Sequence, residues 1–162
     1  MGIIQDLIAS YGYLAIFFVL VLGIFGIPIP DEVLLMIVGY FTNIHVLNYE
    51  LAIFISFAGA FIGVTISYII GRKAGRPLIV KYGKWIGLKE KRVMKVESWM
   101  KKYGAYSLIF GYFIPGFRQV ICCFAGISKM ELKTFITFSA IGSFLWSFTF
   151  ITIGKSIGII HD

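Results

Sequence analysis

The stretch GIPIPDE, residues 26–32, decides the fold because it places two prolines and two acids at the end of an uncharged run, Leu7–Pro30. Proline removes a backbone donor and clashes with the preceding helical turn, so a helix is expected to break here. A second stretch, IPGFR at residues 114–118, combines one proline with one cation in another apolar region. The sequence therefore predicts two helical hairpins, with one break at the tip of each.

Composition indicates the solvent around these hairpins. Hydrophobic residues make up 59% of the 162 residues and charged residues 14%, and the mean hydropathy is +0.89. Soluble domains are about 45–50% apolar and about 25% charged. We therefore expect an integral membrane protein that does not bind nucleic acid. Because broken helices within lipid persist only where protein or a water-filled cavity covers them, both hairpins are predicted to be re-entrant.

Two further uncharged runs have the length of transmembrane helices. Leu51–Gly71 and Thr134–Gly154 each match the roughly 20 residues that a helix needs to cross the hydrocarbon core. The same spacing of 4, 8 and 4 residues relates three glycines and a tryptophan in one to four glycines in the other, which predicts an internal duplication of one hairpin and one span. The matched positions are Gly59, Gly63, Gly71 and Gly75 in the first copy and Gly142, Trp146, Gly154 and Gly158 in the second.

The predicted organisation is one all-α membrane domain. Each repeat crosses the membrane once, so the two copies have opposite orientations and form an inverted repeat. The segment Arg72–Lys102 holds eleven of the 15 basic residues and a local charge of +9, and the positive-inside rule places it in the cytoplasm. An alternative topology makes Leu7–Ile29 a full span. The boundaries are residues 1–162 for the domain, about 8–75 for repeat one, about 76–102 for the basic segment and about 103–158 for repeat two.

The basic segment between the repeats mixes lysine and arginine with apolar residues, Trp85 and Trp99 among them. This composition predicts an amphipathic helical segment that lies in the membrane interface, broken near Gly83 and Gly87. One interpretation is an anchor that sets the topology. The other is a surface that collects an anionic lipid substrate.

Three ionisable side chains, Asp31, Glu32 and Arg118, are predicted to lie deep in the membrane. Such groups are costly there and mark a functional site by default. The inverted arrangement brings the two breaks together from opposite faces, so Arg118 is expected to pair with one of the two acids. The alternative is a structural ion pair that only pins the hairpins together, although apolar packing would stabilise them at least as well.

The chemistry of these groups suits a lipid headgroup. Arg118 offers a planar, permanently charged fork for bidentate binding of phosphate. Low-dielectric surroundings raise the pKa of a carboxyl group, so that it can exchange a proton near neutral pH. Asp31 and Glu32 are therefore candidates for proton coupling or for binding an amine. Gly116 and Gly126 are expected to let the backbone approach a ligand. The hydroxyl groups of Tyr112 and Tyr40 are candidate hydrogen-bond donors, with packing as the alternative role.

Motifs for other chemistry are absent from the sequence. It contains no phosphate-binding GxxxxGK[ST] loop, no GxSxG nucleophile motif and no Cys/His cluster. We therefore expect no enzyme activity, no cofactor and no metal. Any energy for transport would come from an ion gradient or from the lipid gradient itself.

At these residues the chain resembles the DedA family of membrane proteins, the SNARE-associated or VTT-domain group. The resemblance covers about residues 8–158 and implies facing re-entrant hairpins and lipid translocation, in bacteria mainly at the cytoplasmic membrane. Its motifs are GIPIPDE at 26–32, Gly71-Arg72 with Gly75-Arg76, YFIPGFR at 112–118, Ala125-Gly126, Met130, Phe135 and Trp146.

Two departures from the family pattern bear on the substrate. Gly23 stands where relatives often have an acid, and Tyr112 stands where they have the first of two arginines. If those charges bind headgroup or proton in relatives, this chain has one fewer of each sign. The resemblance then implies a headgroup of lower net charge, such as phosphatidylethanolamine, rather than undecaprenyl phosphate.

The sequence thus predicts a multi-pass flippase or scramblase of the bacterial cytoplasmic membrane that moves a phosphate-bearing lipid, either a phospholipid or a polyprenyl phosphate. Arg118 would bind the phosphate, and Glu32, with Asp31 beside it, would accept a proton or an amine. Two alternatives stay open. One is a proton-coupled transporter of a small solute or ion, and the other is a membrane-assembly factor that transports nothing.

Overall fold

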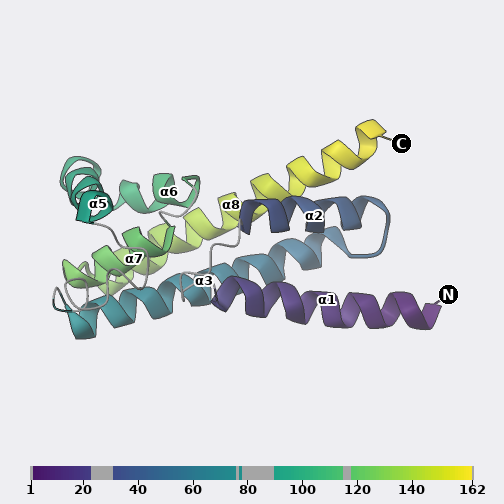
Figure 1. The fold of residues 1–162 in the computed structure, drawn as a ribbon, viewed down its shortest axis with the longest axis horizontal. Helices are drawn as coiled ribbons and strands as arrows, with labels where there is room; N and C mark the ends of the chain where they lie inside the picture. The colour runs from purple at the N-terminus through teal and green to yellow at the C-terminus, as the bar shows by residue number, and fades with distance from the viewer. Residues whose placement is uncertain (1, 23–30, 76, 78–89, 115–117, 162) are drawn as a thin grey trace.

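The computed structural model describes residues 2–22, 31–75, 77, 90–114 and 118–161 (Figure 1). Throughout these ranges the regular secondary structure is helical, which confirms the prediction of an all-α protein. The helices are α1 (Gly2–Leu22), α2 (Asp31–Asn43), α3 (Tyr49–Ala74), α5 (Glu90–Tyr103), α6 (Tyr106–Tyr112), α7 (Arg118–Ile127) and α8 (Leu132–His161).

Each predicted helix break lies between two described helices. Helix α1 ends at Leu22 and α2 begins at Asp31, while α6 ends at Tyr112 and α7 begins at Arg118. The prolines that motivated the prediction lie at 28, 30 and 115, outside the described residues. The two acids occupy the first turn of α2, where the positive end of the helix dipole favours them.

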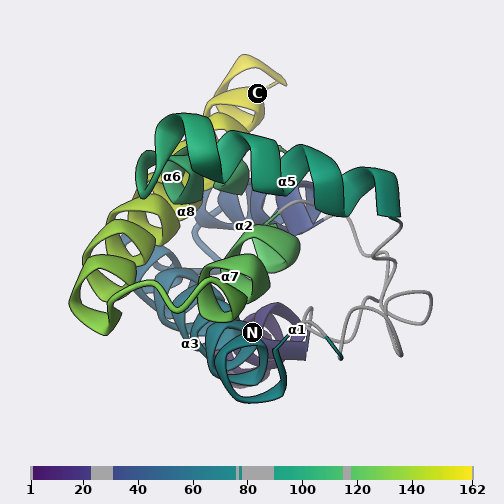
Figure 2. The same ribbon diagram turned by 90° about the vertical axis from the view of Figure 1, so that its left-hand side faces the viewer.

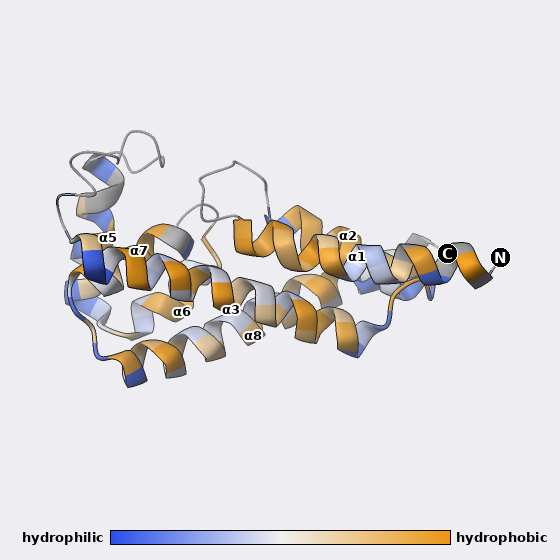
Figure 3. Cartoon of the chain, turned by 90° about the horizontal axis from the view of Figure 1, so that it is seen from below, coloured by the Kyte–Doolittle hydropathy of each residue, from blue (hydrophilic) through white to orange (hydrophobic). Residues whose placement is uncertain are grey.

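The two predicted spans are the long helices α3 and α8. Both are long and apolar enough to cross a membrane. Helix α3 is capped by Asn48, whose side chain accepts a hydrogen bond of 3.2 Å from the Leu51 N–H. It ends at Ala74 and is followed by Gly75, whose φ of 63° is readily adopted only without a side chain. Figure 3 shows hydrophobic residues along most of α1, α2 and α3, whereas hydrophilic residues concentrate in α5.

The shorter helices divide between the two ends of the long ones. Helices α1 and α2 lie along one half of the α3 and α8 pair, and α6 and α7 lie along the other half (Figure 1). The chain runs toward the middle of the molecule in α1 and back out in α2. It repeats this course from the opposite end in α6 and α7, so α2 and α7 begin near each other.

Helices α3 and α7 cross with their backbones in contact. A Cβ atom at Gly71 would overlap the backbone carbonyl of Cys123, and one at Gly126 would overlap the backbone of Tyr68 and Arg72. Small residues at such crossings let helices approach closely, which is the main source of helix association in lipid. Both glycines are therefore required by packing.

Helices α8 and α2 cross in the same way at equivalent positions. A Cβ atom at Gly154 would overlap the backbone carbonyl of Met36, and one at Gly39 would overlap the backbone of Ile151. Each long helix thus packs against the returning arm of the hairpin that belongs to the other half of the chain.

The turns that follow the two returning arms also match. His45, two residues after α2, has a φ of 60°, and Lys129, two residues after α7, has a φ of 56°. In the first turn the Val46 N–H donates to the Phe41 carbonyl at 3.1 Å. In the second, the Met130 N–H donates to the carbonyl of Ala125 at 3.0 Å. The same turn geometry therefore links each arm to its following element.

We expect Gly39→Ala to lower the stability of the protein, because the new methyl group would force the α2 and α8 backbones apart. Overpacking of this kind costs about 1–3 kcal/mol. Gly12→Ala is the matched control, since a Cβ atom there meets only the Leu47 Cδ2 atom at 3.8 Å. Thermal unfolding in detergent measures both, and equal melting temperatures for the two variants would contradict the proposed crossing.

Helix α5 carries the described part of the basic segment and lies across one end of the bundle (Figure 2). Val96 is buried against the bundle, whereas Lys91, Met94 and Lys95 are exposed. The prediction of a helix is confirmed for Glu90–Tyr103, and its amphipathic character stays a prediction. The remainder of the segment, with the breaks expected near Gly83 and Gly87, lies outside the described residues, and the location of the segment in a membrane interface stays a prediction.

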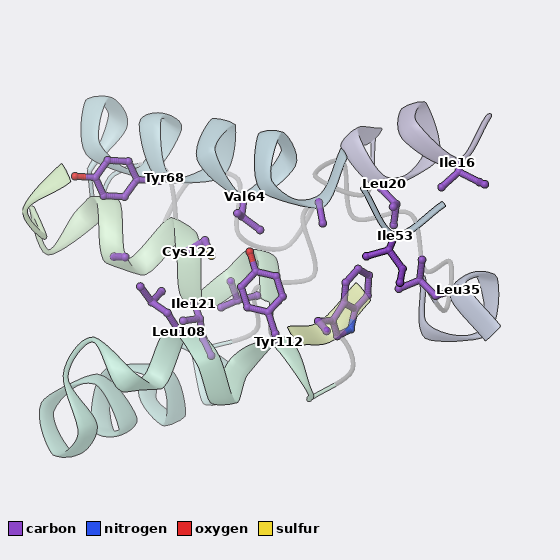
Figure 4. Packing of buried hydrophobic residues seen from close by; sticks show 14 of the residues in the cluster. Ile16, Leu20, Leu35, Ile53, Val64, Tyr68, Leu108, Tyr112, Ile121 and Cys122 are labelled. Carbon is purple, nitrogen blue, oxygen red and sulfur yellow. The ribbon is translucent and has the colours of Figure 1, made fainter. Parts of the chain in front are cut away.

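The buried core follows the length of the bundle. Figure 4 shows Leu108, Ile121 and Cys122 close to the ring of Tyr112, at the end formed by α6 and α7. Toward the other end, Leu20, Ile53 and Leu35 pack where α1, α2 and α3 meet. Between these two groups lies the site formed by the starts of α2 and α7.

Candidate functional site

The two helix breaks meet through an ion pair. Arg118, the first residue of α7, donates from Nη2 to Oδ2 of Asp31, the first residue of α2, at 2.7 Å. The side chain of Arg118 is 7% exposed and that of Asp31 is 17% exposed. Residues 87 positions apart in the sequence thus form a pair that is largely shielded from solvent.

Arg118 has a second neighbour on α8. Its guanidinium carbon lies 4.5 Å from the ring centroid of Trp146, a distance typical of a cation–π contact. Its other terminal nitrogen, Nη1, is buried and has no hydrogen-bond partner within the described part of the chain. Arg118 is therefore held at one edge by a carboxylate and against one face by an indole, while its Nη1 amino group is unused in the described residues.

Glu32 follows Asp31 in α2 and is half-buried. Adjacent positions on a helix point about 100° apart, given 3.6 residues per turn. The sequence predicted that Arg118 would pair with one of the two acids, and in the described residues the partner is Asp31. Glu32 is left beside the pair as a second carboxylate.

Tyr112 ends α6 and is almost completely buried. Its hydroxyl group shares a hydrogen bond with the hydroxyl of Ser143, and its ring centroid lies 6.2 Å from that of Trp146. Tyr112 therefore stands beside the Arg118 site, but its hydroxyl is engaged by the protein itself. Tyr40, the other tyrosine considered, is 44% exposed on α2.

Of the two glycines expected to admit a ligand, Gly116 lies outside the described residues. The expectation for Gly126 is wrong, because the space that its missing side chain leaves is filled by the backbone of α3 at Tyr68 and Arg72. A sequence pattern cannot distinguish a glycine that faces a ligand from one that faces a helix. Gly126 belongs to the α3–α7 crossing.

We expect Tyr112→Phe to destabilise the protein by about 1 kcal/mol, because it removes one buried hydrogen bond and leaves the Ser143 hydroxyl unpaired. Thermal unfolding of Tyr112→Phe, Ser143→Ala and the double variant measures the coupling between the two hydroxyls. Melting temperatures of both single variants equal to that of the wild type would contradict this hydrogen bond.

Trp146 and a row of buried serines were not selected as site residues from the sequence. Trp146 is fully buried, and its Nε1–H group has no partner in the described residues. The hydroxyls of Ser139 and Ser147, on the same helix, and of Ser56 on α3 are also buried and unpartnered there. Serine recurs at every fourth position from 139 to 147, a spacing that predicts three hydroxyls on one face of α8.

The chain matches a known protein family over most of this architecture. The model of the VTT domain matches residues 29–156, which include both members of the ion pair and all but the last residues of α8. The chain belongs to the DedA family of VTT-domain membrane proteins. The resemblance noted in the sequence motifs is thereby confirmed.

Individual members of the DedA family agree with this assignment. The chain is 71% identical to the uncharacterized membrane protein YbfM of Bacillus subtilis, with 99% of each chain covered. It is 33% identical to undecaprenyl phosphate transporter A of Staphylococcus aureus, covering 96% of this chain and 78% of the relative. It is 26% identical to protein DedA of Escherichia coli, covering 97% and 75%. No solved structure gives a significant match.

Membership of the DedA family makes the chain a membrane protein of a type found in bacteria. The apolar helices α3 and α8 agree with this environment. The charged pair of Asp31 and Arg118 is then a polar feature within a mostly apolar helical membrane protein.

Proposed function

We propose that this DedA-family protein moves a phosphate-bearing lipid across the bacterial cytoplasmic membrane as a flippase or scramblase. Arg118 binds the phosphate of the headgroup, and Glu32, beside Asp31, accepts its amine or a proton. The protein does no covalent chemistry on the lipid and needs no cofactor. This role is supported by the family, which includes a protein named for undecaprenyl phosphate transport.

The observation that carries the proposal is the buried Arg118–Asp31 pair, in which the Nη1 amino group of the guanidinium has no partner in the described residues. A buried ion pair seldom stabilises a protein more than apolar side chains of the same volume would. Ionisable groups inside a membrane protein are correspondingly rare unless they act on a substrate or an ion. A phosphate oxygen is an acceptor that fits the unused donor.

The proposed architecture is an inverted repeat of a re-entrant hairpin followed by a transmembrane helix. Its support is the equivalence of the two glycine crossings, in which Gly71 and Gly126 correspond to Gly154 and Gly39. The matching turns after α2 and α7 add to it. In this arrangement the hairpins enter from opposite leaflets, and the ion pair lies near the bilayer midplane, where transporters of this kind place their sites.

Phosphatidylethanolamine is the first substrate proposed, and undecaprenyl phosphate is the second. The position of the family's first arginine holds Tyr112, whose hydroxyl is occupied by Ser143, so Arg118 is the cation available at this site within the described residues. A cation paired with one carboxylate, with a second carboxylate next to it in the chain, suits a headgroup that carries both a phosphate and an amine. The Staphylococcus aureus relative supports the second substrate by its name.

The test is a transport assay in liposomes with a panel of labelled lipids. Phosphatidylethanolamine, phosphatidylglycerol, phosphatidylcholine and undecaprenyl phosphate are compared, each with and without a proton gradient. We expect the purified protein to accelerate transbilayer movement of phosphatidylethanolamine most. Movement of none of these lipids above protein-free liposomes would reject the proposal, while transport of a small solute instead would favour the alternative transporter.

A further inference from the structure

We infer that Trp146 is part of the headgroup site, with its ring supporting the guanidinium of Arg118 and its indole N–H donating to the same phosphate. The inference rests on the proposed function and adds to it a residue with a defined role. Phosphate is therefore bound by one partly neutralised cation together with a neutral donor.

The state of the indole nitrogen is the first observation. Trp146 has no exposed surface, and its Nε1–H group finds no acceptor in the described residues. Buried tryptophan N–H groups usually have a partner, and leaving one unpaired costs about 1–3 kcal/mol. A bound acceptor removes that cost, as a phosphate oxygen would do.

The second observation is that Arg118 carries another buried, unpartnered donor against the same indole. Its Nη1 group lacks a partner in the described residues, while the guanidinium carbon lies 4.5 Å from the centroid of the Trp146 ring. The two free N–H groups thus belong to side chains in direct contact. One phosphate group, which offers several acceptor oxygens, can receive a hydrogen bond from each of them.

The third observation is that two aromatic rings pack against the indole. The ring of Tyr112 lies 6.2 Å from that of Trp146, and the ring of Phe150 lies 6.1 Å from it. Tyr112 is itself fixed by its bond to Ser143, and Gly142 leaves the space that its ring occupies. The donor of Trp146 is therefore oriented before a ligand arrives, which lowers the entropic cost of binding.

These contacts also give a role to Tyr112. It adds no charge, but its ring supports the indole that in turn contacts Arg118.

Two substitutions separate the ring from the N–H group. Trp146→Phe keeps an aromatic face for Arg118 and removes the donor, whereas Trp146→Leu removes both. Phe135→Leu is the matched control, because Phe135 is equally buried but stacks on Tyr68 in another part of the core. Each variant is measured for melting temperature, for phosphatidylethanolamine transport in liposomes and for binding of short-chain phosphatidylethanolamine in detergent.

We expect Trp146→Phe to bind short-chain phosphatidylethanolamine about tenfold more weakly, which is the effect of one hydrogen bond to a charged group. Trp146→Leu is expected to lose at least as much affinity, and Phe135→Leu is expected to bind like the wild type. Unchanged binding and transport in Trp146→Phe, with transport abolished in Arg118→Ala, would overturn this inference and leave the proposed function standing. Absence of transport in the wild type would instead reject the proposed function.

A fluorescence measurement adds a readout that a merely structural tryptophan would not change. In the Trp85→Phe/Trp99→Phe variant, Trp146 is the single remaining tryptophan. We expect its emission to change and saturate as short-chain phosphatidylethanolamine is added, and to stay constant when Arg118→Ala is introduced as well. No change with lipid in the first variant would contradict a headgroup bound at the indole.

Discussion

Replacing Arg118 and Asp31 together by leucine is expected to give a protein that folds and inserts but no longer moves lipid. Either single substitution leaves one buried charge without its partner, and the loss of stability in such cases is about 3–5 kcal/mol. The double substitution removes both charges and fills the space with apolar atoms. Most of the stability lost in the single variants should therefore return, while the phosphate-binding group remains absent.

The comparison of these three variants distinguishes a binding site from a structural pin. Thermal unfolding in detergent reports the stability, and transport of labelled phosphatidylethanolamine in liposomes reports the function. If the pair serves only to hold α2 against α7, the double variant should recover transport together with stability. Recovery of both would overturn the assignment of Arg118 to the headgroup and would favour a protein with a purely structural charge pair.

The second large effect is expected for Glu32→Gln, which should reduce transport at least tenfold and leave stability within about 0.5 kcal/mol of the wild type. The substitution keeps the shape of the side chain and removes its charge. Glu32 is half-buried beside an ion pair that Asp31 already completes, so its charge is not needed to neutralise Arg118. Asp31→Asn serves as the comparison, since it should lower stability as well as transport.

The lipid panel then assigns the role of Glu32. If its carboxylate binds the amine of the headgroup, Glu32→Gln should abolish movement of phosphatidylethanolamine and spare any lipid that lacks an amine. If the carboxylate carries a proton, the variant should lose its response to a proton gradient for every lipid transported. Wild-type rates for all lipids in Glu32→Gln would exclude both roles.

Much of the fold was predictable because it depends on local physical rules. Proline disfavours a continuing helix regardless of its surroundings, and the prolines at 28, 30 and 115 lie between separate described helices. Uncharged runs of membrane-spanning length predicted two long apolar helices, and these are α3 and α8. The acidic and basic residues beside the breaks also predicted an ion pair, since lone charges are too costly in apolar surroundings.

Details that depend on which element lies opposite were not predictable. Asp31 and Glu32 are adjacent and chemically similar, so the partner of Arg118 depends on the angle at which α2 begins. Gly126 was expected to face a ligand, yet it faces α3, and only the position of that helix shows the difference. Trp146 was recognised as a motif residue, but its unpaired donor is visible only in three dimensions.

The two glycine crossings have a mechanical consequence for the pair of Asp31 and Arg118. Helix α2 is fastened to α8 at Gly39 and Gly154, and α7 is fastened to α3 in the corresponding manner. Asp31 is therefore attached to α8 through α2, and Arg118 is attached to α3 through α7. Sliding of α3 past α8 would therefore change the 2.7 Å contact between them, so the ion pair opposes relative movement of the two halves of the chain.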